Sequence, residues 1–148
     1  MHIIASMRGY VEVPCLLEIN IRDQKIERVI ELRSSHPLDN IPDSKRGISG
    51  IQFYNGLIYA ATWNAIYIVC PTDSKVLEII TNRCFSDLHG LYVDQCGTIW
   101  VASTNLDGIY VVKDGIVEPF WHTWEERRLG TPLSLDDQDY RYLTKEKS

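Results

Sequence analysis

Apolar and polar residues alternate along much of this chain with the two-residue period of β-strands. Residues 56–62 and 65–70 are short segments rich in aromatic and β-branched side chains, and residues 75–80 form a third such segment after a turn. Segments of this kind, bounded by Gly, Pro, Asn and Asp, predict strands joined by tight turns. No long stretch has the 3.6-residue period of an amphipathic helix. The pattern therefore predicts an all-β protein.

Two parts of the chain repeat the same succession of strands and turns. The matched segments are 49–53 with 89–93, 55–62 with 96–103, 65–69 with 108–112, and 73–79 with 113–119. The two copies lie about 40 residues apart, and a repeat of this length with four strands is typical of a β-propeller blade. A sandwich of about ten strands would also alternate, but it would not explain a repeat with matched turns.

The N-terminal part of the chain contains an incomplete third copy. Residues 3–6 match residues 59–62, residues 16–21 match the third strand, and residues 24–30 match the fourth, whereas the first strand is missing. We therefore predict one partial β-propeller domain of about three blades, each built from antiparallel strands. Its expected parts are a truncated blade (1–33), a polar linker (34–47), two blades (48–81 and 87–120) and a C-terminal extension (121–148).

The turn and strand at residues 94–104, followed by residues 107–110, carry a resemblance to known blades. The sequence Asp-x-x-Gly-x-Ile-Trp-Val-x-Ser-Thr resembles the repeats of the NHL and senescence-marker/gluconolactonase propellers, which have six blades, and those of two-component sensor propellers. The resemblance implies a propeller architecture and leaves the function open, because propellers host many activities. We interpret Asp94 and Gly97 as turn residues, with the carboxylate capping backbone amides and the glycine at positive φ.

Three blades cannot close a ring, since propellers have about four to eight blades. The chain could be a fragment of a longer protein, a natural half-propeller, or an open set of sheets packed on something else. We expect two chains to associate as a homodimer that completes a six-bladed ring, because this buries both open ends. Residues 138–144 could supply the missing first strand, in the same chain or in its partner.

Charge and cysteine content exclude several classes of partner. The net charge of −5 gives no cationic excess for nucleic acid or an anionic membrane. No apolar run reaches the length of a membrane helix, and the N-terminus lacks the apolar core of a signal peptide. The cysteines form no zinc-binding pattern, so we expect reduced thiols rather than disulfides. Together these features predict a cytoplasmic protein.

Candidate ligand-binding residues lie where propellers usually bind their ligands, at the start of the innermost strands and in the loop after the second strand. They are polar or aromatic, which suits a small polar or sugar-like ligand, and comprise Arg8, Ser49, Trp63, Asn64, His89 and Asn105. The alternative interpretation is that neighbouring hydroxyls, Ser6, Thr62 and Ser103, only cap strand ends.

The sequence favours a non-enzymatic scaffold or ligand-sensing module that associates with itself. The resemblance implies, as the alternative, a gluconolactonase-like hydrolase or lyase with a divalent cation at the axis. Asn64 and Asn105 could offer oxygen ligands to calcium, but no clear acid accompanies them, and Asp107 fits a turn better. The four histidines form no zinc motif, and no catalytic motif is present. We therefore predict no resident metal or cofactor, with calcium as the exception to test.

An aromatic cluster at residues 120–124 places Phe120, Trp121 and Trp124 close together in the sequence. Exposed aromatic side chains can stack on sugars or seal a protein interface. We favour the interface interpretation for this cluster.

Overall fold

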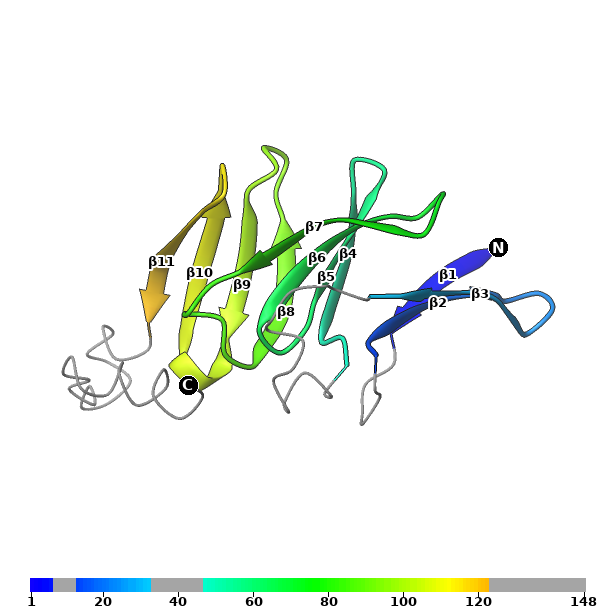
Figure 1. Cartoon of the computed structure of the whole chain (residues 1–148), viewed down its shortest axis with the longest axis horizontal. Helices are drawn as coiled ribbons and strands as arrows, with labels where there is room; N and C mark the ends of the chain where they lie inside the picture. Colours follow the sequence, from blue (N-terminus) through cyan, green and yellow to red (C-terminus); the bar gives the residue numbers. More distant parts are fainter. Residues whose placement is uncertain (7–12, 33–46, 123–148) are drawn as a thin grey trace.

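The computed structural model describes residues 1–6, 13–32 and 47–122. In these residues the protein is built from three antiparallel sheets whose strands follow chain order, and Figure 1 shows the four-stranded sheet β4–β7 between the other two. The first sheet consists of β1 (His2–Ser6), β2 (Cys15–Asn20) and β3 (Lys25–Glu31). The middle sheet consists of β4 (Gly50–Tyr54), β5 (Leu57–Ala61), β6 (Ala65–Cys70) and β7 (Lys75–Thr81). The third sheet consists of β8 (Leu88–Val93), β9 (Ile99–Ser103), β10 (Gly108–Lys113) and β11 (Ile116–His122).

The prediction of an all-β chain is confirmed for the described residues, as are four strands in each of the two full repeats. Only a single short 3-10 helix, Thr104–Leu106, interrupts the strands of this part of the chain. The first sheet has three strands there, as the missing segment of the N-terminal copy predicts. Within the same described residues, no helix has the length and hydrophobicity needed to cross a bilayer.

The turn between β8 and β9 has the predicted construction. One carboxylate oxygen of Asp94 accepts hydrogen bonds from the backbone amides of Cys96, at 2.8 Å, and Thr98, at 3.0 Å. Gly97 has a φ of +81°, which glycine adopts without steric cost. The second carboxylate oxygen accepts the indole N–H of Trp100 at 3.2 Å. The bond from Trp100, supported by those from the two amides, lowers the pKa of the Asp94 carboxyl.

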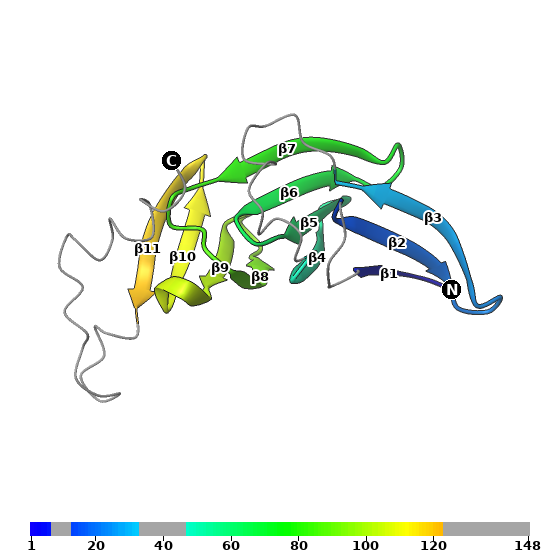
Figure 2. The ribbon, with the colours of Figure 1, turned by 60° about the horizontal axis from the view of Figure 1, so that its bottom comes forward.

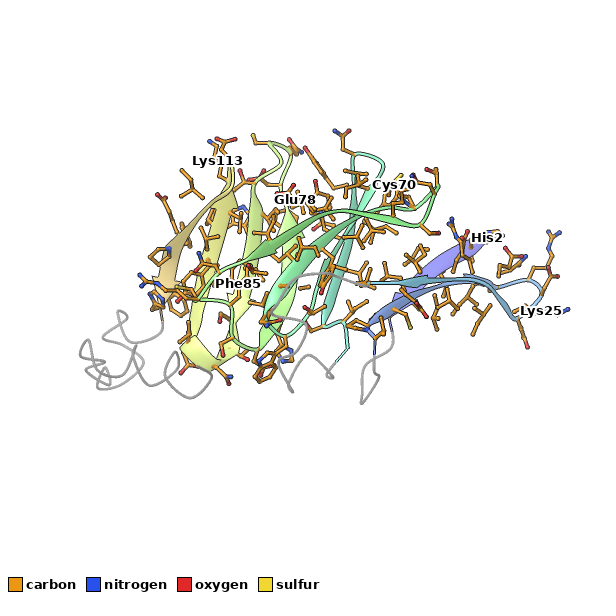
Figure 3. The ribbon with its side chains drawn as sticks, viewed as in Figure 1. His2, Lys25, Cys70, Glu78, Phe85 and Lys113 are labelled. Carbon is orange, nitrogen blue, oxygen red and sulfur yellow. The ribbon has the colours of Figure 1, made fainter. Side chains whose placement is uncertain are left out.

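The middle sheet is buried on both of its faces. Ile58 and Ala60 point to one side, where they pack with Leu16 and Ile30 of the first sheet. Ala61 and Ile66 point to the other side and pack with the third sheet. Phe85, on the connection between β7 and β8, is buried in this second core (Figure 3). Each sheet thus covers an apolar face of its neighbour that would otherwise be exposed to water. Burial of these apolar surfaces holds the three sheets together.

The first strands of the two four-stranded sheets run parallel to each other, although they belong to different sheets. The side-chain amide of Gln52 on β4 bonds to the backbone of Val93 on β8, donating to its carbonyl at 2.9 Å and accepting from its N–H at 2.6 Å. The Tyr54 hydroxyl donates to the carbonyl of Gln95 at 3.0 Å, and Ser49 donates to the carbonyl of Leu88. Figure 2 shows β4 and β8 side by side, each at the edge of its sheet.

The predicted match of residues 3–6 with residues 59–62 is wrong by one position. Ser6 lies opposite Leu16 on β2, and the corresponding pair in the middle sheet is Ala61 opposite Ile66. Both Leu16 and Ile66 are fully buried against the next sheet in the chain. Ser6 therefore corresponds to Ala61 rather than to Thr62. A slip of one residue exchanges the two faces of a strand, so the burial of Leu16 determines the register.

Candidate functional site

Of the six candidate ligand-binding residues, four gather around the start of β8. Leu88 is the centre of this group, because its N–H donates to the carbonyl of Trp63 at 3.1 Å and its carbonyl accepts the hydroxyl of Ser49. His89 follows directly in β8, and Asn105 reaches Ser86 through a bond of 3.1 Å from its side-chain amide to the hydroxyl. Asn64 lies beside Trp63 in the loop after β5, half-buried, and Arg8 lies outside the described residues.

An acid that the sequence analysis missed lies within this group. One carboxylate oxygen of Asp87 is 3.1 Å from the Nε2 atom of His89. The other accepts the hydroxyl of Thr104 at 2.8 Å, and the same hydroxyl is 2.8 Å from the Asp87 carbonyl. Asp87 thus connects the start of β8 to the 3-10 helix that follows β9.

The backbone explains why this acid went unnoticed. Asp87 has a φ of +55°, and Gly47, its counterpart at the start of the middle sheet, has a φ of +74°. The next residues, Ile48 and Leu88, are both buried, so the two copies remain equivalent at these positions. The left-handed region favours glycine but accepts aspartate. The match of the two copies started at Ser49 and His89, and an extension by two residues would have found Asp87.

The hydroxyls at the strand ends form hydrogen bonds with backbone groups, as the alternative interpretation proposed for Thr62 and Ser103. Thr62 is buried and its hydroxyl donates to the carbonyl of Ala65 at 3.1 Å. Ser103 is fully buried, and its hydroxyl donates to the Ser86 carbonyl at 2.9 Å while accepting the Ser86 N–H at 3.0 Å. Ser103 thus holds the connection before β8 against the end of β9 and helps to position the Asp87–His89 pair, whereas Thr62 stabilises the turn between β5 and β6.

The arrangement can orient an imidazole. A carboxylate that accepts Nε2–H favours the tautomer with the proton on that nitrogen and leaves Nδ1 with its lone pair. Asp87 is held in turn by Thr104, so the pair has the acid–imidazole geometry that ligand-binding and general-base histidines share.

A second cluster of ionisable groups lies on the first sheet. Among the described residues, His2, Glu18 and Glu27 form the one group whose ligand atoms lie near enough to hold a metal ion, within 4.8 Å of one another. His2 Nδ1 is 3.1 Å from Glu18, its Nε2 is 3.4 Å from Glu27, and Arg28 approaches Glu18 at 2.6 Å. Hydrogen bonds from His2 and then Arg28 lower the pKa of the Glu18 carboxyl. His2 and Arg28 together contact both carboxylates, so we interpret the cluster as a network of hydrogen bonds and ion pairs. Figure 3 labels His2.

Two of the residues considered for an axial calcium ion, Asn105 and Asp107, are exposed at the 3-10 helix. Asp107 ends that helix with a φ of 46°, and its N–H donates to the Thr104 carbonyl at 3.2 Å. It is therefore a turn residue, as predicted, although the turn is the end of a 3-10 helix and Gly108 already belongs to β10.

Comparison with known proteins assigns the chain to no family. No family model matches the chain, and no curated protein is detectably similar to it.

Proposed function

We propose that this chain is a non-enzymatic scaffold of the β-propeller type, whose ring is completed by a second copy. The observation that carries the proposal is the parallel contact between β4 and β8, sealed by the two hydrogen bonds between Gln52 and Val93. Inner strands that run parallel at adjacent sheet edges are what radial stacking of blades produces. In a two-sheet sandwich each sheet packs through one face only, whereas the middle sheet here packs through both. The middle sheet, covered on both faces, is a complete blade in this arrangement.

The ligand site of this scaffold lies at the start of β8, at one end of the inner strands. His89, oriented by Asp87, and the exposed amide of Asn105 supply hydrogen-bonding groups there, and Trp63 supplies an aromatic surface in the adjoining loop. Such a mixture suits a small polar or sugar-like ligand. The net charge of −5 argues against nucleic acid or an anionic membrane as partner.

The mass of the protein in solution tests the scaffold proposal. Light scattering on a sizing column is expected to give one species of twice the 17.1 kDa of a single chain. Two chains of three sheets each supply six blades, within the usual range. A stable species of 17.1 kDa at micromolar concentration would contradict ring completion and would also remove the argument for an axial ligand site.

A second candidate function is a gluconolactonase-like hydrolase or lyase with a divalent cation at the axis. It is favoured by one observation, the carboxylate of Asp87 beside His89, because the sequence alone offered no acid at this end. The effect of calcium on the melting temperature distinguishes the two candidate functions. If the enzyme proposal holds, calcium raises the melting temperature relative to EDTA, and Asp87→Asn abolishes the shift. A melting temperature that calcium does not change leaves the scaffold as the better proposal.

A further inference from the structure

Two apolar sheet faces at opposite ends of the described structure have no neighbour. The first, which we call the aromatic face, belongs to the third sheet and comprises Tyr92, Trp100, Ala102, Ile109, Val111, Phe120 and Trp121. The second, which we call the aliphatic face, belongs to the first sheet and comprises Ile3, Ala5, Leu17, Ile19, Ile26 and Val29. Phe120 is 61% exposed and Val29 is 52% exposed. Faces of this kind mark interaction surfaces in soluble proteins.

The aromatic face has a counterpart that is already covered. In the repeat, Trp100, Ala102 and Ile109 correspond to Tyr59, Ala61 and Ile66 of the middle sheet. Ala61 and Ile66 are fully buried against the third sheet, and Tyr59 packs against the same core. The third sheet therefore presents the same kind of surface that the middle sheet buries, with nothing in the described residues to cover it.

The aliphatic face has a covered counterpart as well. Leu17 lies opposite Val29, as Tyr67 lies opposite Ile79, and Ile19 lies opposite Ile26, as Val69 lies opposite Val76. Both pairs of strands carry a β-bulge after the same position, which fixes this correspondence. The covered members belong to the core between the first two sheets; these are Tyr67, Val69, Val76 and Ile79. The first sheet thus exposes the kind of surface by which the middle sheet packs on its predecessor.

We infer that the aromatic face of one copy packs on the aliphatic face of a second copy. The inference rests on the proposed function and names the surfaces that close the ring. It repeats a contact that the chain makes twice within itself, where the corresponding face of one sheet meets the next sheet. Two copies make this contact twice, related by a two-fold axis, so that both open ends are buried. Of the aromatic cluster at residues 120–124, Phe120 and Trp121 would then serve this interface, and Trp124 lies outside the described residues.

The acidic residue on the aromatic face is compatible with this packing. Glu118 lies opposite Val111 on the last strand of the third sheet. Its counterpart, Glu78, lies opposite Ile68 on the last strand of the middle sheet and is exposed, although that face packs on the third sheet (Figure 3). Carboxylates at this position therefore remain at the solvent-exposed rim.

Charge substitutions on the two faces test the inference. Phe120→Glu and Val29→Lys each place a charge on the last strand of one face, at a side chain that is already exposed. In either variant alone, a homodimer would bury an unpaired charge at both interfaces, so we expect the dissociation constant to rise roughly 100-fold or more. Leu77→Glu is the matched control, since Leu77 is 56% exposed on the middle sheet, outside both faces. It should keep the mass of the wild type.

Mixing the variants distinguishes the possible arrangements. The Phe120→Glu and Val29→Lys chains together should restore the two-chain species, because one interface is then wild-type and the other pairs Glu with Lys. Dissociation by Phe120→Glu alone, with Val29→Lys unaffected, would mean that aromatic faces pack on each other and would overturn the inference. A two-chain species that neither variant dissociates would overturn it as well. A wild-type monomer, in contrast, contradicts the proposed function itself. Circular dichroism of each variant confirms that it is folded.

Discussion

Replacing Gln52 with leucine is expected to destabilise the protein by about 1–3 kcal/mol for each backbone group that loses its partner. The side-chain amide of Gln52 bonds both to the N–H and to the carbonyl of Val93, which is buried at the edge of the third sheet. β8 is an edge strand, so these groups point away from β9 and need another partner. Leucine fills a similar volume and supplies neither a donor nor an acceptor.

Urea unfolding of the Gln52→Leu variant measures this loss. Gln95→Leu is the matched control, because it makes the same change at an exposed turn residue, and its free energy of unfolding should stay close to the wild type. Equal stability of the Gln52→Leu and wild-type proteins would show that the contact between β4 and β8 does not depend on this amide. The proposal of radially stacked blades, which rests on this contact, would then lose support.

The hairpins were the most predictable part of the fold, because their signal is local. Asn55 and Gly56 both have positive φ, as a two-residue turn between paired strands requires, and Asp94 and Gly97 build their turn from their own side chain and backbone. Residues close in sequence determine these features. Repetition then extended the prediction from one sheet to the next, because equivalent residues face equivalent neighbours.

The first sheet was harder to predict, because a short strand such as β1 has little sequence to fix its alignment. Residues 3–6 could be matched to the middle sheet in two ways that differ by one position, and similarity of residue type favoured the wrong one. The burial of Leu16 against the middle sheet decides between them, and this is a tertiary contact between distant residues.

The grouping of four candidate residues was predictable from the sequence, whereas the acid that lies among them was not. Ser49, Trp63, His89 and Asn105 do gather at the start of β8. Asp87 was missed because the two copies carry different residues there, glycine in one and aspartate in the other, which share a left-handed backbone rather than a side chain. A comparison of residue types cannot detect an equivalence that lies only in φ.

The first residue of β10 shows a difference between the two repeats that the structure explains. Gly108 lies opposite His122, whereas its counterpart Ala65 lies opposite the smaller Thr81. His122 is buried, and its ring is 2.9 Å from the hydroxyl of Tyr110. A Cβ atom at position 108 would lie 2.9 Å from Nε2 of His122 and 3.2 Å from the carbonyl oxygen of Trp121. The ring that replaces threonine thus leaves room for glycine only.

Gly108→Ala should therefore destabilise the protein by about 1–3 kcal/mol, the usual effect of overpacking a buried site. The backbone of Gly108 does not require glycine, because its φ is not positive, so the whole effect comes from the added methyl group. A double-mutant cycle isolates it. In a His122→Ala background the ring is absent, and Gly108→Ala should then cost little, since the two changes share one space. The same loss in both backgrounds would show that the Trp121 carbonyl, rather than the ring, excludes a side chain at position 108.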